Sequence, residues 1–169
     1  FFDHQKQFNA EKTQEVISKD LDQHAQAVIP GFYGSTPDGK VTTFSRGGSD
    51  ITGAIVARGV SADLYENWTD VSGFLMADPR VVKNPKSIKQ ITYRELRELA
   101  YMGASVLHEE AIFPVREAKI PINIKNTNNP NDPGTLIVKD NGNIKLPGSI
   151  TGIAGRKGFT IIAIEETLM

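Results

Sequence analysis

The sequence of 169 residues contains no cysteine, which excludes disulfide bonds, thiolate metal sites and thiol nucleophiles. It has no apolar run approaching the roughly 18 residues that a membrane-spanning helix needs, and no signal peptide opens it. These absences predict a soluble protein with no membrane partner, and they fit the reducing conditions of the cytoplasm.

Neither sign of charge is in excess, because 19 lysines and arginines oppose 20 aspartates and glutamates and leave a net charge of −1. No lysine-rich block is present, so no overall field would attract nucleic acid or an anionic membrane. The Walker A pattern is absent as well, so the sequence gives no support to a P-loop nucleotide site. Any site for an anion must therefore be local.

The sequence does contain enough apolar material for a core, at 39% hydrophobic residues. Helical and strand patterns alternate along it, which predicts an α/β fold with a mainly parallel open sheet flanked by helices. In chain order we expect a helix within 8–24, a buried strand entering a glycine turn over 26–34, a loop or hairpin turn at 35–40, a helix over 50–59, a strand over 62–71, a helix with a capping box over 92–103, a helical stretch over 105–119 that Pro114 breaks or kinks, and a strand over 120–126.

Asparagine, proline, glycine and aspartate are concentrated in residues 126–149, which predicts a domain boundary. We expect a first domain over 1–138, a linker over 139–148 and the beginning of a second domain over 149–169. The chain starts without methionine and stops directly after a strand pattern, so we expect it to be a piece of a longer protein.

The stretch TTFSRGGSD, residues 42–50, places several anion-binding groups at one bend. Its two glycines permit a left-handed backbone and a close approach of a ligand, and a helix starting here would present free N–H groups. Arg46 adds a planar guanidinium that matches a carboxylate or a phosphate. Ser49 or Asp50 is expected to be the N-cap of the helix that follows.

A second polar cluster, TDVSGFLMADPR, follows an expected strand. Thr69 and Asp70 end that strand, and Asp78 and Arg80 flank a proline that stiffens the loop. Two arginines together with several hydroxyls and carboxylates are the groups that a polyphosphate and a small acid would need.

A third and less distinct cluster, MGASVLHEE, spans residues 102–110. Loops that follow the strands of a parallel sheet meet at one edge of it. We therefore expect residues 45–50, 69–80 and 103–106 to converge on one edge of the sheet.

Taken in order, these motifs resemble those of the aspartokinases in the amino acid kinase superfamily. The segments that carry the resemblance are GFYG, TTFSRGGSD, TDVSGFLMADPR, GASVLH, IPINIKNT and GT, in unbroken order over about residues 29–137. One such motif alone is weak support, whereas the ordered series is specific. The resemblance implies a three-layer αβα fold like that of carbamate kinases, incomplete at the amino terminus.

The resemblance implies that the γ-phosphate of MgATP is transferred to the side-chain carboxylate of L-aspartate, giving 4-phospho-L-aspartate in the first step of lysine, threonine and methionine synthesis. Such a transfer depends on positioning and on neutralisation of charge. ATP and Mg²⁺ are the implied cofactors.

By matching positions, the implied catalytic residues are Arg46, which would pair with a carboxylate of aspartate, and Asp50, which would orient a lysine. The implied substrate-binding residues are Arg46, Gly47, Gly48 and Ser49. The implied ATP contacts are Thr69, Asp70, Leu75, Asp78, Arg80 and Ser105.

The family's amino-terminal KFGGTS strand, whose lysine neutralises the transferring phosphate, is absent from this sequence, so the resemblance implies that this chain alone is inactive. Residues 150–166 resemble the first strand of the ACT regulatory module, which implies feedback inhibition of the full-length protein by lysine, threonine or both. A homo-oligomer without a nucleic-acid partner is implied as well.

Three positions depart from the family's pattern. Ser45 stands where glycine is common, Leu75 where tyrosine is usual, and Ser105 where many members have lysine. Two alternatives stay open. One is a superfamily relative acting on another acid, such as glutamate or N-acetylglutamate, and the other is a non-catalytic module that binds nucleotide or senses an amino acid.

Overall fold

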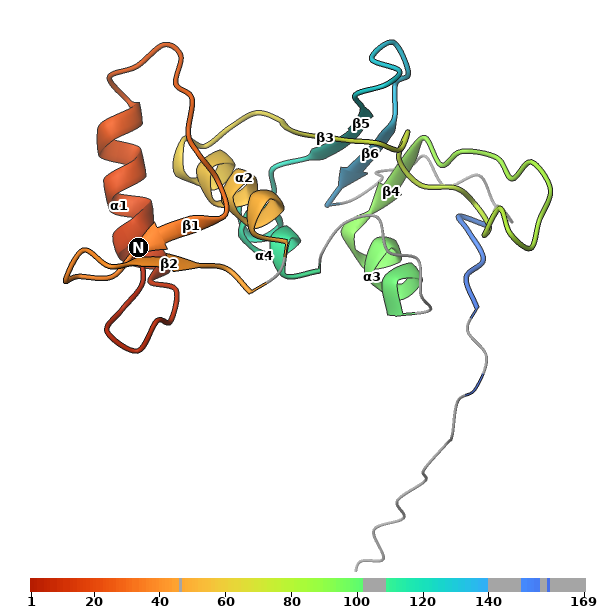
Figure 1. Cartoon of the computed structure of the whole chain (residues 1–169). Coiled ribbons are helices and arrows are strands. Elements are labelled where there is room, and N and C mark those ends of the chain that lie inside the picture. Colours follow the sequence, from red (N-terminus) through yellow and green to blue (C-terminus); the bar gives the residue numbers. More distant parts are fainter. Residues whose placement is uncertain (46, 102–108, 140–149, 156–157, 159–169) are drawn as a thin grey trace, which may run out of the picture.

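The helices and strands follow the expected alternation in the computed structural model, which describes residues 1–45, 47–101, 109–139, 150–155 and 158. Figure 1 shows their arrangement. In chain order they are α1 (Ala10–Leu21), β1 (Tyr33–Ser35), β2 (Val41–Thr43), α2 (Gly48–Gly59), β3 (Tyr65–Thr69), β4 (Gln90–Thr92), α3 (Tyr93–Tyr101), α4 (Glu109–Ala118), β5 (Ile122–Asn126) and β6 (Thr135–Val138).

The main sheet has the strand order β3-β5-β6-β4. β3 pairs with β5 and β4 pairs with β6 in parallel, whereas β5 and β6 are antiparallel. The antiparallel pair arises because only residues 127–134 separate β5 from β6, and a parallel neighbour would need a much longer crossover. The α/β class is confirmed, with a sheet that is mixed at its centre.

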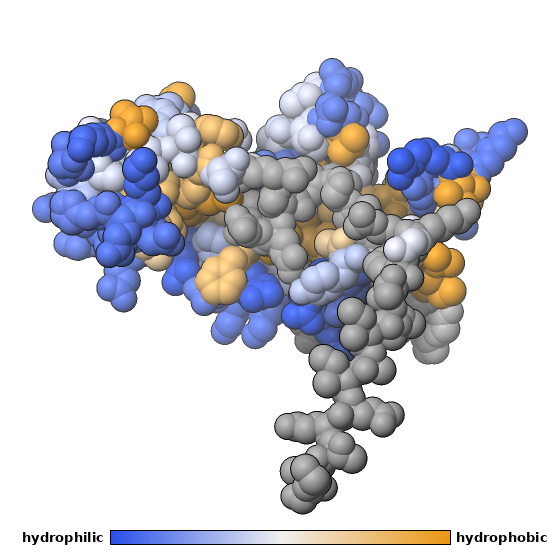
Figure 2. Space-filling model, turned by 60° about the horizontal axis from the view of Figure 1, so that its bottom comes forward, coloured by the Kyte–Doolittle hydropathy of each residue, from blue (hydrophilic) through white to orange (hydrophobic). Residues whose placement is uncertain are grey.

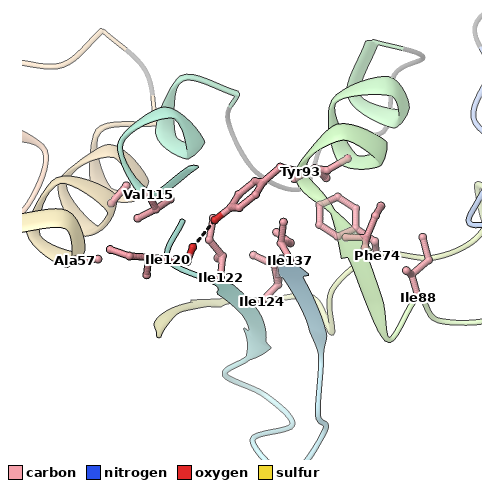
Figure 3. Close-up of a cluster of buried hydrophobic side chains, with 12 residues drawn as sticks. Ala57, Phe74, Ile88, Tyr93, Val115, Ile120, Ile122, Ile124 and Ile137 are labelled. Carbon is pink, nitrogen blue, oxygen red and sulfur yellow. Dashed lines mark hydrogen bonds between the residues drawn. The ribbon is translucent and has the colours of Figure 1, made fainter. Parts of the chain in front are cut away.

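The core lies on one face of this sheet, where α3 and α4 cover it (Figure 3). Ile122 and Ile124 of β5 and Ile137 of β6 are fully buried there, because alternate residues of a strand point to the same face. Val115 of α4 is fully buried against the same cluster. The apolar alternation of IPINIK therefore provides the buried surface against which α3 and α4 pack.

Tyr93, the first residue of α3, is buried in this core and donates a hydrogen bond from its hydroxyl to the carbonyl of Ile120, 2.5 Å away (Figure 3). Burial raises the pKa of Tyr93 to about 12. The hydroxyl must stay protonated to donate this bond.

We expect the free energy of unfolding to fall as the pH rises from about 10 to about 12, because the unfolded tyrosine, with a pKa of about 10, ionises first. The folded chain keeps the proton of Tyr93 up to about pH 12. Its contribution is therefore complete below about pH 10 and is lost as the pH passes the folded pKa. Urea unfolding across this range should show a flatter pH dependence for Tyr93→Phe than for the parent, and equal slopes would contradict the assignment.

The amino-terminal part consists of α1 and the hairpin of β1 and β2, which lie beside α2 in Figure 1. The predicted turn at 35–40 is confirmed, since β1 and β2 pair in antiparallel fashion around it. α1 supplies hydrogen-bond donors to the carboxyl end of α2. The Ser18 hydroxyl donates to the carbonyl of Gly59 at 2.8 Å, and the Gln14 side-chain amide donates to the carbonyl of Arg58 at 3.2 Å. These bonds satisfy carbonyls that a helix end leaves free.

One sequence expectation was wrong, and another was wrong in part. Residues 26–32 form no strand, and Val28 is 99% exposed, because no described strand lies beside this segment to pair with its backbone. The break expected at Pro114 is wrong, since α4 runs through this residue to Ala118, whereas the kink stays a prediction. The burial of Val115 in the core outweighs the one hydrogen bond that proline removes.

The capping box of α3 is confirmed. The Glu95 carboxylate accepts from the amide of Thr92 at 2.9 Å and from its hydroxyl at 2.7 Å, and that hydroxyl accepts from the Glu95 amide at 3.1 Å. Gly103, the expected end of this helix, lies outside the described residues. The same carboxylate accepts from the Thr151 hydroxyl at 2.7 Å, so the segment after the predicted linker packs against α3.

Apolar side chains also reach the surface. On the face shown in Figure 2 they appear in separate places among hydrophilic residues. Over all the described residues, the most exposed large apolar side chains include Val28, Val41 and Val81. Within the described part of the chain, every helix is too short or too polar to cross a membrane.

Candidate functional site

The first turn of α2 is built on glycine. Gly47 is the N-cap and has a left-handed φ of 61°, which a side chain would disfavour. Gly48 is buried, and a Cβ there would lie 2.8 Å from Cδ2 of Phe32. The expected N-cap at Ser49 or Asp50 was wrong, because the bend at Gly47 starts the helix earlier and places these two residues inside its first turn.

This helix start presents free backbone donors. No described residue accepts a hydrogen bond from the amides of Gly48, Ser49 or Asp50, while Ile51 begins the helical ladder by donating to the carbonyl of Gly47 at 3.0 Å. Free amides and the helix dipole together favour an anion at this end. Arg46, the predicted cationic partner of such an anion, lies outside the described residues.

Asp50 is fixed in orientation by β3. The side-chain amide of Asn67 donates to Asp50 Oδ1 at 3.0 Å and to the Tyr65 hydroxyl at 2.9 Å. That hydroxyl in turn donates to the backbone carbonyl of Asp50 at 3.3 Å. Burial raises the pKa of Tyr65, so the hydroxyl remains a donor over a wide range of pH.

Asn67 and Tyr65 were not identified as site residues from the sequence. The pattern of the strand predicts only that Tyr65 belongs to the core or to an interface. The available signal was Asn67, an amide at a buried position of a strand, since a buried amide needs hydrogen-bonding partners.

The carboxyl end of β3 carries Thr69 and Asp70, whose side chains meet at 3.2 Å. Thr127 donates to the Thr69 carbonyl from its amide at 2.8 Å and from its hydroxyl at 2.9 Å. Next to it, the Asn126 amide donates to the Ser72 hydroxyl at 2.9 Å. The turn after β5 therefore holds the loop after β3, as the shared edge of parallel strands allows.

Gly73 lets this loop cross the edge of the sheet. Its φ of 86° is left-handed, and a Cβ would lie only 2.2 Å from the Thr135 hydroxyl. Thr135, fully buried at the start of β6, accepts from the Phe74 amide at 2.9 Å and donates to the Ile88 carbonyl at 2.5 Å. One hydroxyl thus holds the loop on both sides of residues 75–87.

We expect Thr135→Val to lower the free energy of unfolding by about 2 kcal/mol, because it leaves a buried amide and a buried carbonyl without partners. Chemical denaturation would measure this loss. Thr43→Val, at an exposed position of β2, is a control that should stay within about 0.5 kcal/mol. Equal stability of Thr135→Val and the parent would show that this hydroxyl does not hold the loop.

Asp78 and Arg80 form a preassembled pair. The Arg80 guanidinium donates to Asp78 Oδ2 at 2.6 Å and its backbone amide donates to Oδ1 at 2.8 Å. These bonds lower the pKa of Asp78 to about 2 and raise the pKa of Arg80. The Arg80 side chain is 87% exposed, so its remaining N–H groups face the solvent. Leu75 is also exposed and bridges to Ser87.

The structure thus places residues 47–50 next to β3, two residues before its carboxyl end, and holds residues 69–74 at that end through contacts with Asn126, Thr127 and Thr135. Asp78 and Arg80 lie farther along, in the part of the loop between Phe74 and Ile88. The third predicted segment, including Ser105, lies outside the described residues. The start of α2 offers anion-binding amides and a fixed carboxylate. The end of β3 and the loop after it offer hydroxyls and an arginine–aspartate pair.

This chain is similar to known proteins. The model of the amino acid kinase family matches residues 4–126. The chain is 52% identical over 142 residues to aspartokinase 3 of Bacillus subtilis (strain 168), an alignment that covers 84% of this chain and 31% of that protein.

Solved structures are similar as well. Aspartate kinase of Clostridium acetobutylicum superposes with a TM-score of 0.82 at 62% identity, over 91% of this chain and 35% of that one. E. coli aspartokinase III in complex with aspartate and ADP gives a TM-score of 0.72 at 35% identity, over 81% of this chain and 31% of that one. The chain spans about a third of the length of these relatives.

Proposed function

From the premise that this chain belongs to the amino acid kinase family, and within it to the aspartokinases, we propose that the protein carrying it transfers the γ-phosphate of MgATP to the side-chain carboxylate of L-aspartate. The product is 4-phospho-L-aspartate, in the first step toward lysine, threonine and methionine. The observation that carries the proposal is the start of α2, where three free amides and an oriented carboxylate lie next to the end of β3.

The amides of Gly48 and Ser49, with Gly47 and the guanidinium of Arg46, hold the carboxylate of aspartate or the oxygens of the phosphoryl group in transfer. A carboxylate nucleophile is already ionised at neutral pH and needs no base. The chain therefore contributes positioning and neutralisation of charge rather than proton transfer. Asp50 acts on the phosphoryl group only indirectly, because it orients a lysine that the rest of the protein supplies.

ATP lies along the loop after β3, near Thr69, Asp70, Leu75, Asp78 and Arg80, with Ser105 as a further contact. The donor set fits this assignment, because Arg80 keeps N–H groups directed at the solvent while Asp78 fixes its orientation. Mg²⁺ would supply charge neutralisation at the phosphates. Asp70 offers an exposed carboxylate that would contribute to holding it.

Residues 149–169 begin an ACT module through which lysine, threonine or both inhibit the full-length protein, a homo-oligomer. In support, E. coli aspartokinase III has been solved in complex with lysine and aspartate. The packing of Thr151 against Glu95 gives that module a direct contact with the kinase domain.

Assays of the full-length protein with L-aspartate, L-glutamate and N-acetyl-L-glutamate test the substrate. Phosphorylation of aspartate alone supports the proposal, and a preference for either other acid would replace it with the alternative of a superfamily relative. Calorimetric titration of this chain with MgATP tests the alternative of an amino-acid-sensing module, since binding indicates an intact nucleotide half-site and no binding would support the module. We expect the chain by itself to bind MgATP and to transfer no phosphate.

A further inference from the structure

We infer that Asn67 is a positioning residue that orients the carboxylate of Asp50 for phosphoryl transfer, with Tyr65 as its support. This inference rests on the proposed function. It concerns a residue of β3 that does not itself reach the substrate, and it starts from the closed set of hydrogen bonds between β3 and the first turn of α2.

The bonds leave Asp50 little freedom. Asn67 directs one amide hydrogen to Asp50 Oδ1 and the other to the Tyr65 hydroxyl, and that hydroxyl donates to the Asp50 backbone carbonyl. The side chain and the main chain of Asp50 are therefore tied to the same two residues of one strand. An aspartate held through both its side chain and its main chain loses less rotational freedom when it takes up its working geometry.

The local packing is arranged for this network. Gly53, one turn after Asp50, has no side chain, and a Cβ there would lie 2.5 Å from the Tyr65 hydroxyl. The bare helix face lets the tyrosine ring reach the backbone of Asp50. Asn67 itself is 8% exposed, so its amide has given up water for these two partners.

One oxygen of Asp50 stays available. Asn67 occupies Oδ1, and no described residue donates to Oδ2. An oxygen that is oriented but unoccupied can receive a cation, as the proposed contact with a lysine requires. Asn67 thus determines which oxygen of the carboxylate faces the reaction.

The test is the kinetics of Asn67→Leu in the full-length protein. We expect kcat for aspartate phosphorylation to fall about tenfold, because a hydrogen bond to a charged group is lost, while KM for MgATP changes by less than about twofold. Asn123→Leu is the matched control, since Asn123 lies in the neighbouring strand and its buried amide oxygen has no partner among the described residues. Its kcat should equal that of the parent.

The combination with Asp50→Asn separates positioning from a structural role. If Asn67 acts through the charge of Asp50, Asn67→Leu should lower kcat no further in the Asp50→Asn background. A repeated tenfold loss there would overturn the inference. Asn67→Asp keeps the shape of the side chain but cannot donate when ionised, so a parental kcat in this variant would also overturn it, even if Asn67→Leu failed to fold. A parent that does not phosphorylate aspartate would count against the proposed function instead.

Discussion

Replacing Arg46 by alanine should lower kcat/KM for aspartate by about 30- to 1000-fold, equivalent to about 2 to 4 kcal/mol of transition-state binding. Arg46 directly precedes Gly47, where the chain bends into α2 beside the free amides. Its guanidinium is expected to pair with a carboxylate of aspartate away from water, and removing one partner of such a pair leaves the other unpaired. Steady-state kinetics of the full-length protein with varied aspartate and varied MgATP would measure the loss.

Two other arginines serve as comparisons. Arg58→Ala removes a surface pair with Glu117 on a partly exposed helix end and should leave both substrates unaffected. Arg80→Ala should raise KM for MgATP more than KM for aspartate, because Arg80 belongs to the loop assigned to the nucleotide. If Arg46→Ala altered only KM for MgATP, the roles assigned to Arg46 and Arg80 would be reversed.

Asp50→Asn should lower kcat of the full-length protein by about 100-fold or more, while the affinity of this chain for MgATP barely changes. The asparagine keeps the shape of the side chain and an oxygen that accepts from Asn67, so the first turn of α2 should stay intact. What it loses is the negative charge that we propose orients a lysine beside the transferring phosphate. The sequence contains no KFGGTS motif to supply such a lysine, so we expect the nucleotide affinity of this chain to be independent of the charge.

Kinetics of the full-length protein and calorimetry of this chain would measure the two effects separately. Asp63→Asn, at an exposed position before β3, is the control for loss of one carboxylate and should leave both values unchanged. Loss of MgATP binding by the Asp50→Asn chain would place Asp50 on the nucleotide or its Mg²⁺, contrary to the role proposed here.

The parts of the fold that depend on local pattern could be predicted from the sequence. The spacing of Ile51, Ala54 and Ile55 predicts the buried face of α2, and all three are buried. The capping box at Thr92 and the turn before Val41 follow from local side-chain and turn chemistry in the same way.

The parts that depend on distant neighbours could not be predicted. The apolar pattern at Val28 is typical of a strand, but a strand forms only where another backbone accepts its hydrogen bonds. The N-cap at Gly47 depends on Phe32 packing against Gly48, a contact between two separate segments. For the candidate site, the motifs indicate Asp50 and the loop after β3, whereas Asn67 acquires its role only when β3 lies beside α2.

The antiparallel pairing of β5 with β6 also affects how the sheet assembles. These two strands are joined through residues 127–134, so their contacts close a short loop and cost little chain entropy. Tyr65 of β3 pairs with Ile122, and Gln90 of β4 pairs with Leu136, across much longer stretches of chain. Contacts between residues near in sequence form early in folding, and distant ones follow once a template exists. The sheet should therefore grow from its centre outward, with the edge strand that carries Asn67 among the last parts to join.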